Sequence, residues 1–300
     1  MFSDFIKISD LTKDDIESLV DDGVGFKNRS KTSQVEGKTV CLMFFENSTR
    51  TKISFEVAAN KLGMNVINFD NSNSSINKGE SLKETIENLY FIGIDAVVIR
   101  TSDENMIREL KTQTSYPMRF VNAGSGKASH PSQALLDYFT MQEKLGDIKD
   151  KKISIVGDIE HSRVAKSNIE LLKKFGANIV ISAPDYFKPD VIPQGAEFIS
   201  DLKTAIADSD VIMGLRIQKE RIKERYSEEE YISNYRLNSK LLDECAPKAI
   251  LMHPGPVNRD IEITSELLDS ERGKTILEQA RNGVFVRMAI LNKILGDECI

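Results

Sequence analysis

The feature that most constrains the fold is a regular alternation of short β-branched runs with longer segments of helical periodicity. Strands buried on both faces read as continuous apolar runs, and strands that alternate with helices form parallel sheets covered by helices. The sequence therefore predicts an α/β fold. Seven runs are expected to be strands: Val40–Phe45, Met64–Phe69, Ala96–Ile99, Ile153–Val156, Ile179–Ile181, Val211–Met213 and Ala249–Met252.

The helix that follows the first of these runs shows the periodicity most clearly. Phe55, Ala58, Ala59 and Leu62 recur at i, i+3, i+4 and i+7, so they share one apolar face. Gly63 is expected to end this helix, because glycine readily adopts the left-handed conformation found after helix ends.

The number of strands also predicts the domain organisation. Seven strands are too many for one small α/β unit, and a chain of 300 residues has room for two domains. The boundary is expected near His130–Pro131, where a loop rich in Gly, Ser and Ala, Ala123–Ser129, ends the first set of strands. The helix after Pro131 would then link the two domains.

Composition excludes several classes of function. With 40 Lys and Arg against 46 Asp and Glu, the net charge of −6 argues against binding to nucleic acid or to an anionic membrane surface. No apolar run approaches the length of a transmembrane helix, and no signal peptide is visible at the start. The three cysteines, Cys41, Cys245 and Cys299, lack metal-site spacing and are expected to be reduced thiols of a cytoplasmic protein. With only three histidines, we expect no metal centre.

The strongest chemical signal is FFENSTRT, Phe44–Thr51, where a buried strand gives way to a polar turn and a helix. Ser48 and Thr49 are good N-cap residues, and a helix start presents free N–H groups and the positive end of the helix dipole. The guanidinium of Arg50 and the hydroxyl of Thr51 would complete an anion cradle. A plain capped helix with a solvated arginine is the alternative, and the GxxxxGK[ST] pattern of nucleotide P-loops is absent.

A second glycine-containing turn, in IVGDIEHS, suggests a dinucleotide-binding dehydrogenase as a rival interpretation. Asp158 to Ser162 follow Gly157 directly, so the second and third glycines of GxGxxG are missing. Without them the backbone cannot approach a pyrophosphate closely, which argues against this interpretation.

The segment FFENSTRTKISFEVAANKLG resembles the carbamoyl-phosphate signature of the aspartate and ornithine carbamoyltransferases. Further blocks resemble segments of that family in the same order, so the similarity extends from about residue 40 to residue 291. These blocks are KGESLKET, VNAGSGKASHPSQALLDYFT, ISIVGDIEHSRVAKSN, DVIMGLRIQKER, MHPGPVNRDIEI and VFVRMAIL.

The resemblance implies a two-domain α/β fold in which the C-terminal helix, Val284–Leu295, returns to the first domain. Residues 1–130 with 285–300 would then form a carbamoyl-phosphate-binding domain, and residues 131–284 an aspartate-binding domain. Positions 47, 52, 101, 125 and 132 depart from the commonest family residues, and none of these departures removes a proposed ligand group.

The acceptor-binding half is expected to decide the substrate. Ornithine-using relatives typically carry Ser-Met-Gly in the block that corresponds to Leu215–Gln218, and His-Cys-Leu-Pro where this chain has His253–Pro256. This chain offers Arg216 and Gln218 in the first block, and Arg163 after a strand. Two arginines suit the two carboxylates of aspartate and would repel the cationic end of ornithine. One alternative is an enzyme that uses ornithine or another amine as acceptor. The other is a non-catalytic member of the family that binds carbamoyl phosphate or serves as a scaffold.

The resemblance also implies individual roles. Thr51, Arg100 and His130 would contact the carbonyl oxygen of carbamoyl phosphate and act as the catalytic residues. The other groups expected to bind carbamoyl phosphate are Ser48, Thr49, Arg50, Gln133, the backbone of Pro254 and Gly255, and Ser74 and Lys78 of the adjacent subunit. Those expected to bind aspartate are Lys78, Arg163, Arg216 and Gln218.

The stretch DNSNSSINKG, which holds Ser74 and Lys78, reads by composition alone as a surface loop. His161 is expected to be structural and His253 to support the loop of Pro254 and Gly255. The family reaction needs no cofactor or metal and belongs to pyrimidine biosynthesis. The resemblance also implies a homotrimer in which neighbouring subunits share active sites. It leaves open whether regulatory chains bind.

Overall fold

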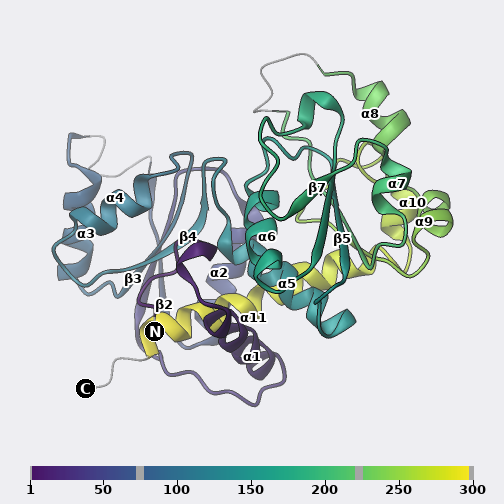
Figure 1. Cartoon of the computed structure of the whole chain (residues 1–300). Coiled ribbons are helices and arrows are strands. Elements are labelled where there is room, and N and C mark those ends of the chain that lie inside the picture. The colour runs from purple at the N-terminus through teal and green to yellow at the C-terminus, as the bar shows by residue number, and fades with distance from the viewer. Residues whose placement is uncertain (1, 72–77, 220–225, 297–300) are drawn as a thin grey trace. The chain divides into compact units, whose positions relative to one another are not determined.

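The computed structural model describes residues 2–71, 78–219 and 226–296, and the chain folds into two compact units (Figure 1). Unit 1 comprises Met1–Leu135 and Asn282–Ile300, and unit 2 comprises Leu136–Arg281. The chain passes from one unit to the other within α5 (Pro131–Leu145) and again within α11 (Lys274–Gly296). The expected return of the C-terminal helix to the first unit is confirmed.

Unit 1 is built on a four-stranded parallel sheet in the order β2-β1-β3-β4. The strands are β1 (Thr39–Phe44), β2 (Asn65–Asn68), β3 (Ala96–Thr101) and β4 (Arg119–Ser125). The helices that lie wholly in this unit are η1 (Ile8–Asp10), α1 (Lys13–Lys27), α2 (Thr49–Lys61), α3 (Leu82–Phe91) and α4 (Met106–Gln113).

Unit 2 is built on a five-stranded parallel sheet in the order β7-β6-β5-β8-β9. The strands are β5 (Lys152–Val156), β6 (Asn178–Ser182), β7 (Ala196–Phe198), β8 (Val211–Gly214) and β9 (Ile250–Met252). The helices that lie wholly in it are α6 (Arg163–Lys174), η4 (Asp185–Phe187), α7 (Leu202–Ile206), α8 (Glu228–Tyr235), α9 (Ser239–Cys245) and α10 (Ser265–Asp269).

The predicted α/β fold is confirmed, and all seven predicted runs overlap strands. β4 and β7 were not predicted. The first three residues of the predicted loop Ala123–Ser129 belong to β4, so that part of the prediction was wrong. β4 carries polar side chains that are satisfied inside the fold, since Asn122 Nδ2 donates to Ile6 O at 2.9 Å and to Ser125 Oγ at 3.1 Å.

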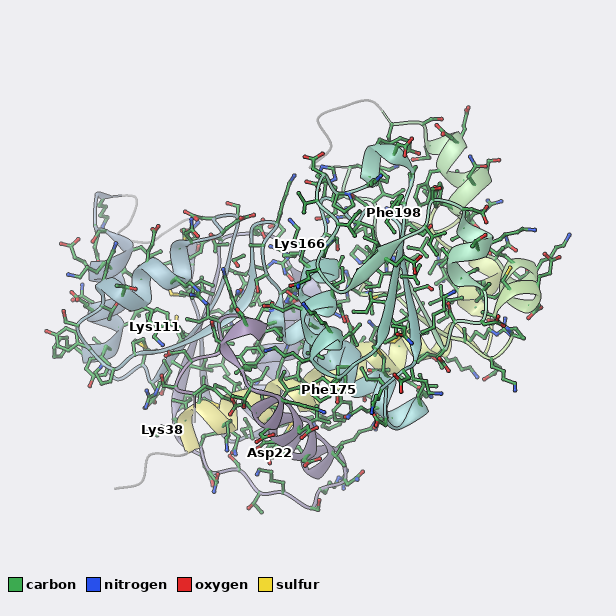
Figure 2. All side chains as sticks on the ribbon, in the orientation of Figure 1. Asp22, Lys38, Lys111, Lys166, Phe175 and Phe198 are labelled. Atoms are coloured by element: carbon green, nitrogen blue, oxygen red, sulfur yellow. The ribbon has the colours of Figure 1, made fainter. Side chains whose placement is uncertain are left out.

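The apolar face of α2 packs as predicted. Phe55, Ala58 and Ala59 are fully buried, and Gly63 follows the helix with φ +75°. Side chains fill the space between each sheet and its helices (Figure 2), and in unit 2 the ring of Phe175 stacks on Tyr138 with centroids 4.4 Å apart. None of the helices described is both long enough and apolar enough to cross a membrane.

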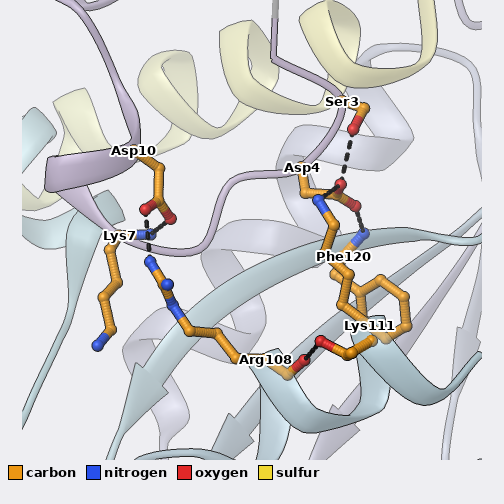
Figure 3. A network of polar contacts seen from close by, with 8 residues as sticks. Ser3, Asp4, Lys7, Asp10, Arg108, Lys111 and Phe120 are labelled. Carbon is orange, nitrogen blue, oxygen red and sulfur yellow. Dashed lines mark hydrogen bonds and ion pairs between the residues drawn. The ribbon is translucent and has the colours of Figure 1, made fainter.

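The N-terminal segment is attached to the edge of the unit 1 sheet that β4 forms (Figure 3). Phe5 forms a parallel bridge with Val121 of β4. The Asp4 carboxylate accepts a hydrogen bond from the Phe120 backbone N–H at 2.8 Å and pairs with Lys111 of α4. The segment thus continues the sheet beyond β4 and connects it to α4.

The last part of α11 is attached to unit 1 by a buried cation. Arg287, which is 3% exposed, donates to Ser54 Oγ of α2 at 2.8 Å, and its guanidinium lies 5.0 Å from the centre of the Phe55 ring. Lys27 Nζ at the end of α1 donates to Asn282 Oδ1 at 2.9 Å, and Figure 1 shows the yellow α11 beside α1. The C-terminal helix therefore holds the helix that begins at the predicted anion cradle.

We predict that Arg287→Met lowers the free energy of unfolding by about 2–4 kcal/mol, because it removes a buried charged hydrogen bond and a cation–π contact. Arg281→Met is the matched control, since Arg281 is exposed on the same helix. That variant is expected to change the unfolding free energy by less than about 0.5 kcal/mol. Urea denaturation of both variants measures the difference, and equal effects would contradict the role assigned to Arg287.

Candidate active site

Each sheet has one point at which the strand order reverses. In unit 1 this point lies between β1 and β3, and in unit 2 between β5 and β8. In open parallel sheets, ligands bind beyond the carboxyl ends of the strands at such a point, because the connections depart to opposite sides and leave a crevice. The predicted site residues fall into two groups, one beside each point.

The first group in unit 1 follows β1, at the start of α2. Ser48 has the extended N-cap conformation predicted for it, but among the described residues its hydroxyl accepts no capping hydrogen bond. Within the described first turn of α2 there is no acidic side chain. Thr51 is buried, Ser48 is half-buried, and Thr49 and Arg50 are exposed. The positive end of this helix, with Arg50 beside it, is suited to an anion.

The second group in unit 1 lies at the end of β3. Arg100 is in register with Phe44 of β1, and the Phe45 N–H donates to the Arg100 carbonyl oxygen at 2.8 Å. The Arg100 side chain donates to Ala123 O at 3.2 Å, and its Nε lies 3.6 Å from Glu46 Oε2. Glu46 therefore helps to orient Arg100, a role that was not predicted. Its place directly after β1 is the signal that could have indicated it.

The third group in unit 1 lies after β4, at the start of α5. His130 is 4% exposed, and its carbonyl oxygen accepts from the Gln133 N–H at 3.1 Å, which fixes both residues in the first turn. β3 and β4 are neighbours, with Thr101 opposite Ser125. The ends of β1, β3 and β4 thus bring three groups to one edge of the sheet. Lys78 is exposed ahead of α3, and Ser74 lies outside the described residues.

The corresponding residues of unit 2 follow β5 and β8. Arg163 is the first residue of α6 and is 6% exposed, and the Ser162 side chain caps this helix by accepting from Ala165 N at 3.1 Å. Arg216 and Gln218 are half-buried after β8. The Leu215 N–H donates to Val156 O at 2.8 Å, so the ends of β5 and β8 stay side by side.

The loop after β9 is arranged around His253, which is 2% exposed. The Gly255 N–H donates to His253 Nδ1 at 2.8 Å, so the ring hydrogen is on Nε2, which lies 3.3 Å from Glu262 Oε2. The prediction that His253 supports the loop of Pro254 and Gly255 is confirmed. Glu262, which was not predicted, also accepts from the Ile217 N–H at 2.8 Å and so joins this loop to the one after β8.

A neutral phenol lies beneath these loops. Burial raises the pKa of the Tyr231 hydroxyl well above its ordinary value, and the carboxylates of Glu262 and Asp158 raise it further. Tyr231 therefore adds no negative charge to that of Glu262 and Asp158. Within the described part of the chain no group of three or more His, Cys, Asp and Glu side chains could hold a metal ion.

We predict that Gly157→Ala destabilises the protein by about 2–5 kcal/mol, through backbone strain and crowding. Gly157 directly follows β5 with φ +125°, and an added Cβ would lie 3.0 Å from Leu215 O and 3.1 Å from the Tyr231 hydroxyl. Gly146→Ala is the control, because Gly146 has φ +73° and a Cβ there would meet no described atom within 4 Å. The control is expected to lower the free energy of unfolding by only about 1–2 kcal/mol in urea denaturation. Equal losses in the two variants would refute the proposed crowding against Leu215 and Tyr231.

Comparison with known proteins places these features in one family. Residues 3–143 match the family model described as "Aspartate/ornithine carbamoyltransferase, carbamoyl-P binding domain". Residues 149–294 match the one described as "Aspartate/ornithine carbamoyltransferase, Asp/Orn binding domain". An aspartate carbamoyltransferase catalytic subunit of Streptococcus pneumoniae is 40% identical over 293 residues, which is 97% of this chain and 95% of that protein.

Two solved structures show how far the likeness extends in three dimensions. An aspartate transcarbamoylase from Trypanosoma cruzi, in complex with carbamoyl phosphate and aspartate, is 28% identical with a TM-score of 0.87, over 98% of this chain and 97% of that one. An ornithine carbamoyltransferase from Pyrococcus furiosus is 29% identical with a TM-score of 0.87, over 99% and 98%. With two family models matched in order along nearly its whole length, this chain belongs to the aspartate/ornithine carbamoyltransferase family.

Proposed function

We propose that the chain transfers the carbamoyl group of carbamoyl phosphate to the α-amine of L-aspartate, giving N-carbamoyl-L-aspartate and phosphate. This is an early step of pyrimidine biosynthesis. The fold alone does not select the acceptor, since the aspartate and ornithine enzymes match with equal TM-scores. The observation that carries the choice is the pair Arg163 and Arg216, which follow the neighbouring strands β5 and β8. Two guanidinium groups at one sheet edge suit a dicarboxylate.

The donor is assigned to the first domain, residues 1–130 with 285–300. The start of α2, which has no side-chain cap among the described residues, and the exposed Arg50 favour a phosphate group there. Ser48, Thr49 and Arg50 would neutralise the phosphate, with Ser74 and Lys78 of the adjacent subunit. Gln133 would hold the carbamoyl amide, and the backbone carbonyls of Pro254 and Gly255 would accept from its NH₂. Residues 131–284 are assigned to the acceptor, which Arg163, Arg216, Gln218 and the neighbour's Lys78 would align.

In this reaction the amine lone pair of aspartate attacks the carbonyl carbon, a C–N bond forms, and the C–O bond to phosphate breaks. Thr51, Arg100 and His130 would stabilise the negative oxygen of the tetrahedral intermediate, an effect worth about 3–4 kcal/mol for a well-placed donor. Holding the two substrates in line contributes roughly 7–11 kcal/mol. The departing phosphate is itself a base that can take the amine proton.

The shared site requires a cyclic trimer, which we propose as the assembly. Lys78 supports this, because it is exposed at the start of the segment before α3 and can reach a neighbouring molecule. Head-to-tail contacts of this kind close into a ring when the rotation is three-fold. A cytoplasmic location accords with the reduced thiol of Cys41, which is fully buried.

The acceptor assay tests the proposed reaction directly. We predict that incubation with carbamoyl phosphate yields a ureido product with L-aspartate, and that ornithine at equal concentration yields almost none, because its distal cation is repelled by Arg163 and Arg216. Colorimetric detection of the ureido group measures both. Faster turnover of ornithine than of aspartate would refute the choice of acceptor.

The shared site is tested by mixing inactive variants. Arg50→Ala and Lys78→Ala proteins are each expected to be nearly inactive, since both remove charge from the phosphate site. After denaturation and joint refolding, about three quarters of randomly assembled trimers are mixed, and each mixed trimer regains one intact site. Roughly a quarter of wild-type activity should therefore return.

The control for this mixing experiment is Lys61→Ala, which removes an exposed charge at the other end of α2 and should stay active alone. Mass spectrometry of the refolded trimers verifies that subunits have exchanged. No recovery after verified exchange would place Lys78 on an ordinary surface loop and contradict the shared site.

A further inference from the structure

A closed ring of hydrogen bonds joins the two substrate-side loops of unit 2. Asp158, which is fully buried, accepts through Oδ1 from the His161 N–H at 3.2 Å and lies 2.8 Å from His161 Nδ1. Its other oxygen accepts from the Gln218 N–H at 3.1 Å. The Gln218 side-chain amide donates to the His161 carbonyl oxygen at 2.7 Å and closes the ring.

The ring fixes the protonation and the direction of its members. A carboxylate only accepts hydrogen bonds, so the His161 ring hydrogen that faces it is on Nδ1. One amide hydrogen of Gln218 is used on the His161 carbonyl. Among the residues that the structure describes, the other hydrogen and Oε1 have no partner, and both suit a ligand. The orientation of the Gln218 amide therefore depends on where the His161 backbone lies, and two bonds to Asp158 Oδ1 hold that backbone, one from the His161 N–H and a shorter one from the imidazole.

The place of the ring in the fold connects it with the acceptor. Asp158 and His161 lie between the end of β5 and Arg163, and Gln218 lies two residues after Arg216. The ring thus sets the spacing between the two loops that carry the arginines. The His161 side chain is 13% exposed, at the carboxyl edge of the sheet, and its ring meets Phe187 edge to face at 6.3 Å.

We propose that His161 is a positioning residue for the acceptor. Through Asp158, His161 holds Gln218 in place. In this way it also keeps Arg163 and Arg216 at the separation that binds the dicarboxylate. This inference rests on the proposed function. It assigns to the imidazole an effect on aspartate binding and none on carbamoyl phosphate, whose proposed phosphate-binding groups lie in unit 1.

The test compares two substitutions of His161 that differ in one donor. His161→Leu removes the hydrogen bond to Asp158. His161→Asn keeps an N–H donor at nearly the same distance from the backbone as Nδ1. The matched control is Tyr235→Phe, which removes a hydroxyl that donates to Ala183 O at 3.0 Å and Ser200 O at 2.7 Å, away from the ring.

In His161→Leu the KM for aspartate is expected to rise about tenfold or more, as the loss of a charged hydrogen bond predicts. The KM for carbamoyl phosphate and the kcat at saturating aspartate should stay within about threefold of wild type, the signature of lost binding shared by ground and transition states. His161→Asn should recover most of the aspartate affinity. Tyr235→Phe should lower the melting temperature and leave both KM values unchanged.

If the leucine variant does not fold, His161→Gln, whose donor lies one bond further out, replaces it with the same expected rise in the KM for aspartate. An aspartate KM that rises no more than that for carbamoyl phosphate, or an asparagine variant without recovery, overturns the role of His161 while the wild-type reaction stands. A wild-type protein that carbamoylates no aspartate overturns the proposed function, and this inference with it.

Discussion

The reversal of strand order in each sheet is the constraint on which the rest of the molecule depends. Because all neighbouring strands are parallel, their carboxyl ends lie at the same edge, and the reversal leaves this edge open between β1 and β3 and between β5 and β8. At this edge lie Arg50 in the first turn of α2, Arg100 at the end of β3, Arg163 at the start of α6 and Arg216 in the loop after β8. The same topology thus places arginines at the carboxyl edge of the sheet in each unit, where we propose that anions bind.

The two edges use different physical means. In unit 1 the start of α2 supplies backbone N–H groups and the positive end of a helix dipole, which suit a phosphate with several equivalent oxygens. In unit 2, where we propose that the acceptor binds, two buried acids hold the loops in place. Asp158 and Glu262 are both almost completely buried, and each accepts hydrogen bonds from more than one loop. These acids fix the backbone of the loops after β5, β8 and β9.

The sequence predicts the parts of this arrangement that are local. The apolar runs mark the buried strands, and the polar turn between β1 and α2 marks the anion cradle, because both signals lie within a few neighbouring residues. β7 escapes prediction since it is a three-residue, half-exposed edge strand. The Asp158 to Gln218 bond joins residues 60 positions apart, and Gln34 to Asn292 joins residues 258 apart. Such pairs exist only after the sheet order is set, so no pattern along the chain reveals them.

The central proposal is that unit 1 binds the donor and unit 2 binds the acceptor. Calorimetric titration with a ligand that joins a phosphonate to a dicarboxylate tests it most directly, using the wild type and the Arg50→Ala and Arg216→Ala variants. The account predicts binding far tighter than that of phosphate or succinate, because one ligand loses translational freedom only once. Each variant should weaken it severely. Affinity no greater than that of phosphate, or affinity unchanged in either variant, would contradict the account.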